Sequence, residues 1–274
     1  MPLDALVLAL ASAALHAGWN YWVKTSDDRL LAMWGVIVGG AVLFLPVVLV
    51  RGIDPVTYPY LIASGVALTG YVFALAAAYE RVDFSLAYPV ARGTAPAVAA
   101  LLGLVFLSES LGIPATLALA LIVLSLLFMV GRPNAIPGIE FALLTGFIIA
   151  TYSVIDAAGA RRIDDGLTYS AAVYVVNAVL ATPLVVMARG RAILPVIRRR
   201  ALPMLVAGAA SVVAYALVLS AALRAPVGLV SAVRETSVII GAWLGTVRLG
   251  EDGQRRRIVA AAGVVAGIAL LGFG

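Results

Sequence analysis

Residues 91–109 read ARGTAPAVAALLGLVFLSE, and residues 233–251 read VRETSVIIGAWLGTVRLGE. An offset of 142 positions aligns the two stretches without a gap. Each carries an arginine, a threonine two residues later and a glutamate 17 residues after the arginine. Arginine is rare within a long apolar run. Two such arginines in matching surroundings indicate an internal repeat that covers much of the chain.

Apolar runs of about 20 residues continue on both sides of these stretches. A helix of that length crosses a hydrocarbon core about 30 Å thick. Hydrophobic residues make up 63% of the 274 residues and charged residues only 12%, whereas soluble domains carry about 25% charge. The composition predicts an all-α integral membrane protein and excludes an ordinary soluble enzyme. The predicted transmembrane helices cover residues 3–23, 30–50, 59–79, 85–107, 111–131, 139–160, 167–188, 201–222, 226–247 and 256–273.

The repeat divides these ten transmembrane helices into two sets of five, over residues 1–134 and 135–274. Because five is an odd number, the second set enters the membrane from the opposite side. The sequence therefore predicts two inverted five-helix repeats within one membrane domain. Many secondary transporters have this architecture and bind their substrate near the midplane, between the repeats.

Residues of reactive type are scarce, and their scarcity excludes several classes of function. The chain has no cysteine, so thiol catalysis and thiolate metal sites are excluded. His16 is the only histidine and Lys24 the only lysine, and no phosphate-loop glycines precede that lysine. We therefore predict a protein that is not an enzyme and that uses no ATP, cofactor or metal.

Three motifs resemble the EamA family of the drug/metabolite transporter superfamily. They are His16-Ala17-Gly18-Trp19-Asn20, the stretch YPVARGTAP at residues 88–96, and Gly250-Glu251. The resemblance covers the whole chain and implies a bacterial inner-membrane, multi-pass protein that exports small metabolites, amino acids being a well-known class. Position 238 departs from the family pattern, because valine replaces the proline expected there from Pro96 in the other repeat.

Arg92 and Arg234 are the leading candidates for substrate contact. Each lies about 10–12 Å along its predicted helix. Because the two helices enter the membrane from opposite faces, both arginines are near the midplane. A buried arginine usually faces a water-filled cavity or a charged partner. A carboxylate or phosphate of a substrate fits this requirement, and so do backbone carbonyl groups or Glu235.

Glu235 is the acidic residue that the prediction places deepest in a helix, since Asp156 and Glu140 are assigned near helix ends. Neighbouring side chains on a helix point about 100° apart, so pairing of Glu235 with Arg234 is not expected. We expect Glu235 to pair with Arg92 between the repeats, or to bind a substrate ammonium group or a coupling proton.

Six further residues complete the predicted site. Tyr88 shares a helix face with Arg92, and His16 either couples transport to protons or hydrogen-bonds a neighbouring helix. Trp19 and Asn20 end the first helix, where they either meet the substrate or form an interfacial belt. Tyr71 and Tyr215 occupy repeat-related helices and either stack on the substrate or pack against other helices.

Other residues are expected to have structural roles. Glu109 and Glu251 are expected to interact with the free backbone amides at helix starts. The glycine pairs Gly35/Gly39, Gly241/Gly245 and Gly263/Gly267 are expected to let helices approach closely.

The favoured function is export of a small polar or zwitterionic metabolite, with amino acids, including aromatic ones, preferred. Two alternatives stay open: a flippase for lipids or lipid-linked sugars, and an intramembrane enzyme. The expected partners are a small-molecule substrate and the lipid bilayer. Coupling to a proton stays open, and so does the choice between monomer and homodimer.

The distribution of basic residues argues against nucleic-acid binding, despite the net charge of +5. Loops on one predicted face carry 13 of the 19 basic residues and loops on the other face carry 4. Such asymmetry identifies the cytoplasmic face of a membrane protein. We therefore expect the loops at 189–200 and 248–257 in the cytoplasm and both termini outside.

Reporter fusions test this orientation directly. A reporter that is active only in the cytoplasm should be active at residues 189–200 and 248–257 and silent when fused after Gly274. Cytoplasmic activity of the fusion after Gly274 would show that the chain is inserted the other way round.

Overall fold

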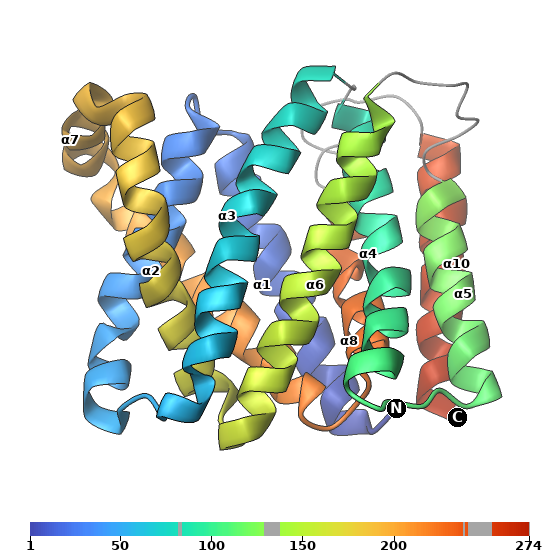
Figure 1. Ribbon diagram of the computed structural model, residues 1–274. Coiled ribbons are helices and arrows are strands. Elements are labelled where there is room, and N and C mark those ends of the chain that lie inside the picture. The colour runs from blue at the N-terminus through green and yellow to red at the C-terminus, as the bar shows by residue number, and fades with distance from the viewer. Residues whose placement is uncertain (82–83, 129–137, 238, 241–253, 274) are drawn as a thin grey trace.

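The computed structural model describes residues 1–81, 84–128, 138–237, 239–240 and 254–273, and within these ranges the regular structure is helical throughout. The helices run between an upper and a lower face, and both termini lie at the lower face (Figure 1). Their bounds are α1 Leu3–Lys24, α2 Arg29–Arg51, the 3-10 turn η1 Pro55–Thr57, α3 Tyr58–Arg81, α4 Phe84–Phe106, α5 Ile113–Phe128, α6 Ile139–Ile163, α7 Gly166–Ala222, α8 Val227–Arg234 and α10 Gln254–Phe273.

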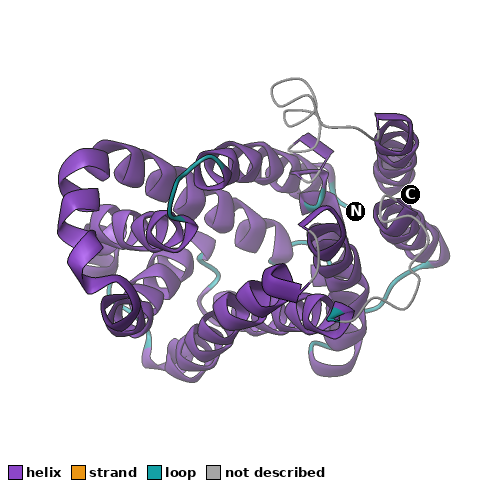
Figure 2. Ribbon diagram, turned by 90° about the horizontal axis from the view of Figure 1, so that it is seen from above, coloured by secondary structure: helices purple, strands orange, loops and turns teal. Residues whose placement is uncertain are grey.

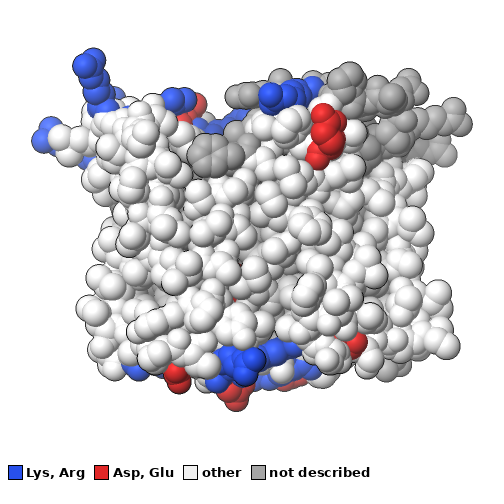
Figure 3. Space-filling view, viewed as in Figure 1, with Lys and Arg blue, Asp and Glu red and all other residues white. Residues whose placement is uncertain are grey.

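The surface has the appearance of a membrane protein. In the view of Figure 3 a broad uncharged belt separates an upper from a lower rim of charged side chains. Leucine, valine and phenylalanine side chains are exposed along most helices, among them Leu49, Leu101 and Phe106. Among the described residues, α1, α2, α6 and α7 are long and apolar enough to cross a membrane. The prediction of a multi-pass, all-α membrane protein is therefore confirmed.

Helix α7 differs from the prediction, because it covers two predicted transmembrane helices and the loop between them. Its 57 residues contain non-helical backbone at Arg189, where the direction of the chain changes (Figure 1). Apart from Arg189, the segment at 189–200, expected to be a loop, is helical. Ile193 and Val196 pack against the cluster around Trp34, whereas Arg198 to Arg200 are exposed. One apolar and one basic face allow this segment to lie along the membrane surface as a helix.

The ninth predicted helix, at residues 226–247, differs from the prediction in the opposite way, because it is interrupted. Helix α8 begins after Pro226 and ends at Arg234, Glu235 forms a turn, and helical backbone resumes at Thr236. The amide of Glu235 is shared between the carbonyl groups of Ser231 and Ala232, each 3.2 Å away. With φ at −68° and ψ at −5°, Glu235 stays close to helical geometry, and the departure from a regular helix affects the chain after it.

The two halves of the chain are interwoven. Helix α2 packs on α7, α3 and α4 pack on α6, and α1 packs on α7. Helices α5 and α10 form a separate pair at one edge of the molecule, as the view from above shows (Figure 2). The core between the halves is built largely from alanine and valine, which allow these helices to lie close together.

Glycines set the closest of these approaches. A Cβ atom on Gly39 would collide with the carbonyl oxygen of Met204, and one on Gly208 would collide with the backbone of Gly40. The predicted role of the Gly35/Gly39 pair in intramolecular packing is confirmed, and so is that of Gly263 and Gly267, which face Ser125 and Ile122 of α5. The pair Gly241/Gly245 lies outside the described residues.

A glycine-to-alanine comparison measures how much the contact between α2 and α7 matters. Gly39→Ala should destabilise the detergent-solubilised protein by about 1–3 kcal/mol, because the backbones must separate. Gly70→Ala is the control, since nothing lies within 4 Å of a Cβ at Gly70 of α3. It should be neutral or stabilise by up to about 1 kcal/mol. Equal unfolding temperatures for the two variants would contradict this account of the packing.

Candidate functional site

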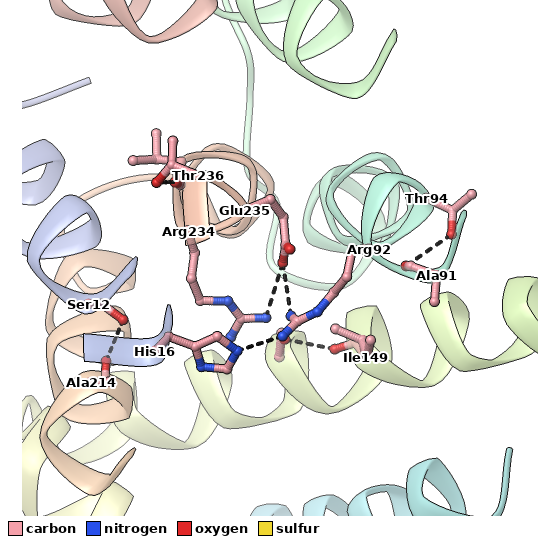
Figure 4. Close-up of polar contacts among 12 residues, drawn as sticks. Ser12, His16, Ala91, Arg92, Thr94, Ile149, Ala214, Arg234, Glu235 and Thr236 are labelled. Atoms are coloured by element: carbon pink, nitrogen blue, oxygen red, sulfur yellow. Dashed lines mark hydrogen bonds and ion pairs between the residues drawn. The ribbon is translucent and has the colours of Figure 1, made fainter. Parts of the chain in front are cut away.

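Four polar side chains from α1, α4 and the end of α8 converge between the halves (Figure 4). Arg92 donates one hydrogen bond to Glu235 Oε1, at 3.1 Å, and another to His16 Nε2, at 2.6 Å. The Arg234 guanidinium lies 3.6 Å from the same Glu235 oxygen. Arg92, Arg234 and Glu235 are all buried. We call His16, Arg92, Arg234 and Glu235 the central cluster.

Small residues allow α4 to reach both of its neighbours in this region. A Cβ at Gly228 of α8 would collide with Ala100 of α4, and one at Gly146 of α6 would collide with Thr94 and Ala91. Helices that approach this closely bring the Arg92 side chain within hydrogen-bonding distance of Glu235. Ala91 and Ala100 of the first quoted stretch, together with Gly146 and Gly228, are thus part of what forms the central cluster.

The central cluster confirms one prediction about Glu235 and corrects another. The ion pair between Arg92 and Glu235 joins the two halves, as expected. The expectation that Glu235 does not pair with Arg234 was wrong, because both guanidinium groups face one carboxylate oxygen. The prediction considered only the directions in which the two side chains leave the helix, whereas the long Arg234 side chain brings its guanidinium group beside the neighbouring carboxylate (Figure 4).

Arg234 is the less satisfied of the two arginines. Its Nε and Nη2 atoms are buried and have no hydrogen-bond partner among the described residues. Glu235 Oε2 and the hydroxyl groups of Ser231 and Ser237 are in the same condition. Buried polar atoms without partners are costly, so their concentration in one place marks a site where a polar ligand would be stabilised.

A small cavity adjoins Arg234. Its polar lining comes from Ser153, Tyr215, Ser231 and Arg234, and the rest is apolar. It has room for about one water molecule. A larger ligand would therefore require the surrounding helices to move apart.

His16 and Trp19 of α1 belong to the same region. The ring of Trp19 packs edge-on against His16, with 4.7 Å between ring centres. Trp19 Nε1 and Asn20 Nδ2 are buried and have no partner among the described residues. An interfacial belt is therefore the wrong interpretation of Trp19 and Asn20, because α1 continues to Lys24 and both polar atoms face the interior.

The predicted site tyrosines do not all lie beside the central cluster. Tyr215 lines the cavity beside Arg234. Tyr71 packs edge-on against Tyr152 of α6, at 6.2 Å between ring centres, and so belongs to a neighbouring aromatic cluster. Tyr88 is part of α4, but its side chain lies outside the described part of the structure.

Asp156 is the residue that sequence reasoning placed wrongly. It was assigned near a helix end, yet α6 continues to Ile163 and the Asp156 side chain is fully buried. The hydroxyl groups of Tyr215 and Tyr169 donate to its two carboxyl oxygens. The signal that was available is that Asp156 lies about 10 Å from the end of a longer apolar helix.

Glu109 has the structural role that was expected of it. Its carboxylate accepts hydrogen bonds from the backbone N–H of Val227, at the start of α8, and from Arg161 of α6, at 2.5 Å. Arg161 also donates to the carbonyl of Ala222, at the end of α7. These contacts fix the start of the helix that carries Arg234. The repeat-related Glu251 lies outside the described residues.

Comparison with known proteins identifies the family. Residues 136–273 match the model of the EamA-like transporter family. The chain belongs to this family. The EamA-like transporters are part of the drug/metabolite transporter superfamily, so the resemblance noted from the three motifs is confirmed.

Solved structures extend the likeness to the entire EamA-like chain. One crystal structure superposes with a TM-score of 0.74 over 99% of this chain and 97% of its own length, at 17% sequence identity. At that identity the comparison shows a shared fold. Among solved structures 27 chains match this one, whereas no curated protein matches.

A double-mutant cycle tests the ion pair in this EamA-like transporter. Glu235→Gln leaves Arg92 buried without its charged partner and should destabilise the protein, whereas adding Arg92→Gln should restore part of the loss. The coupling free energy should be about 0.5–3 kcal/mol, measured by thermal unfolding in detergent.

The exposed pair of Arg51 and Asp165 is the matched control. Its atoms are 2.8 Å apart, but the two side chains are 53% and 32% exposed. The cycle of Arg51→Gln and Asp165→Asn should give coupling below about 1 kcal/mol. Effects of Glu235→Gln and Arg92→Gln that simply add would show that the two charges do not interact.

Proposed function

We propose that this EamA-like protein is a secondary exporter of small zwitterionic metabolites, with amino acids, including aromatic ones, as the favoured class. The observation that carries the proposal is the state of Arg234. Two buried guanidinium groups face one carboxylate oxygen, and two nitrogen atoms of Arg234 lack hydrogen-bond partners among the described residues. This arrangement favours an added anion, because a carboxylate would both balance charge and accept those hydrogen bonds.

The rest of the surroundings suits the other parts of an amino acid. Glu235 Oε2 is buried without a partner in the described structure and can accept from an ammonium group. The rings of Trp19 and Tyr215, together with apolar residues of the cavity such as Val218 and Val230, offer an apolar surface. The family consists of transporters, which supports transport rather than catalysis as the activity of this site.

The contacts between helices support ten membrane crossings arranged as an inverted repeat. If α1 corresponds to α6, α3 to the second part of α7, and α4 to α8, the contacts occur in related pairs. The contact of α3 with α6 matches that of α1 with α7, and the contact of α4 with α6 matches that of α1 with α8. Helices α4 and α8 enter from opposite faces (Figure 1). A site between such halves is suited to alternating access.

Transport by purified protein in liposomes tests the proposal. Radiolabelled amino acids, tested one by one, should exchange across the membrane in the wild-type protein. Arg234→Ala should raise KM for the transported amino acid about ten- to hundredfold, because one charged hydrogen-bonding partner is lost. Phenethylamine, which lacks the carboxylate of phenylalanine, should fail to compete with the amino acid.

Arg224→Ala is the matched control, since Arg224 is exposed and pairs with Asp4, in the first turn of α1. It should insert, purify and transport like the wild-type protein. Unchanged transport by Arg234→Ala, or equal competition by phenylalanine and phenethylamine, would remove Arg234 from the substrate site.

A further inference from the structure

A second buried acid lies apart from the central cluster. Asp156 of α6 is fully buried, and both of its carboxyl oxygens accept hydrogen bonds from tyrosine hydroxyl groups. Among the described side chains, no arginine or lysine forms an ion pair with it. An ionised carboxylate in this position is expensive, whereas a protonated carboxyl group is not.

The groups around Asp156 are hydroxyls rather than charges. Tyr169 and Tyr215 of α7 contact it directly, and a further ring of titratable and charged residues interacts with those two tyrosines or packs against them. These residues are Tyr60 of α3, Tyr152 of α6, Tyr174 of α7 and Arg234 of α8, and Tyr71 of α3 packs in turn on Tyr152. Of these, Arg234 is the group that carries a fixed charge.

Tyr215 connects this carboxyl group with the central cluster. Its hydroxyl donates to Asp156, and the same residue lines the cavity that Arg234 also lines. A ligand that enters the cavity must therefore contact the side chain that hydrogen-bonds Asp156. Occupancy of the substrate site and the protonation of Asp156 are thereby linked through one tyrosine.

His16, which the sequence suggested as a proton carrier, is placed unfavourably for that role. Its Nε2 lies 2.6 Å from Arg92 Nη2. Arginine has only donor nitrogens, so Nε2 must be the acceptor and the ring must be neutral. A proton added to this ring would remove the hydrogen bond and face a guanidinium group.

We propose that Asp156 binds the proton that is exchanged for substrate, with Tyr215 as the positioning residue between the two sites. The proton adds to a carboxylate oxygen from the aqueous side toward which the protein is open and leaves to the opposite side after the helices rearrange. Substrate crosses in the opposite step. This inference rests on the proposed export function and identifies its coupling ion.

Infrared difference spectroscopy tests proton binding without any substrate. Acidifying the wild-type protein in liposomes should produce the C=O stretching band of a protonated buried carboxyl group. The band should be absent from Asp156→Asn and present in Asp164→Asn, a control in the exposed turn after α6. A band that persists unchanged in Asp156→Asn overturns the proposal.

A conservative variant covers the case in which Asp156→Asn does not fold. Tyr215→Phe keeps the carboxyl group but removes one donor that stabilises its ionised form. The band should then titrate with a midpoint at higher pH than in the wild-type protein. An unchanged midpoint overturns the link between Tyr215 and Asp156.

Transport separates the coupling from the proposed function itself. With radiolabelled amino acids as probes, substrate exchange without a gradient depends on the substrate site, so Asp156→Asn should retain it. An acidic lumen, one pH unit below the outside, should drive up to about tenfold accumulation by the wild-type protein if one proton leaves per substrate. Asp156→Asn should reach no accumulation, and Asp164→Asn should behave like the wild-type protein.

The remaining outcomes each have one meaning. Accumulation driven by the pH gradient in Asp156→Asn overturns the proposal that Asp156 is the coupling site. Wild-type accumulation that follows a sodium gradient instead of a pH gradient overturns it as well. Neither result contradicts the proposed export function. Absence of exchange for every probe overturns the proposed function, while the infrared band still decides whether Asp156 binds a proton.

Discussion

The ion pair between Arg92 and Glu235 is the interaction on which the arrangement of the two halves depends. Each side chain comes from a different half, and each would cost about 2.5–3.5 kcal/mol in hydrocarbon on insertion scales without a partner. Because neither charge can reach water, the helices that carry them must stay close enough for contact. The alanines and glycines of α4, α6 and α8 are the residues that permit such closeness.

Helix α8 is held in place at both of its ends, first of all by Glu109. This residue, after α4 in the first half, accepts hydrogen bonds from the start of α8 in the second half. The same helix is therefore held at its start by Glu109 and at its end by the contact of Glu235 with Arg92. Between these points α8 is buried on all sides, which fixes the direction in which Arg234 points. The position of Arg234 is thus determined by contacts at both ends of a short helix.

The sequence was sufficient to predict the parts of this arrangement that depend on composition and spacing. The apolar runs place the helices, because about 20 apolar residues in succession have no other stable environment. The matched arginines predict two residues at similar depth near the repeat axis, and the structure brings both to one carboxylate between the halves. The sequence was insufficient where local backbone geometry decides: the turn at Glu235, the helical segment at 189–200, and the true end of α6 beyond Asp156. Each of these is stabilised by contacts with distant residues, and periodicity does not report such contacts.

The two arginines of the central cluster are held to different degrees, and this difference suits transport. Arg92 has two close partners, Glu235 at 3.1 Å and His16 at 2.6 Å, so it is held in a defined position. Arg234 lies 3.6 Å from Glu235 and retains nitrogen atoms without partners among the described residues. An incoming carboxylate can therefore bind Arg234 without first breaking the ion pair that joins the halves. Under the proposed function, stability and ligand binding therefore belong to separate arginines, although both face the same carboxylate.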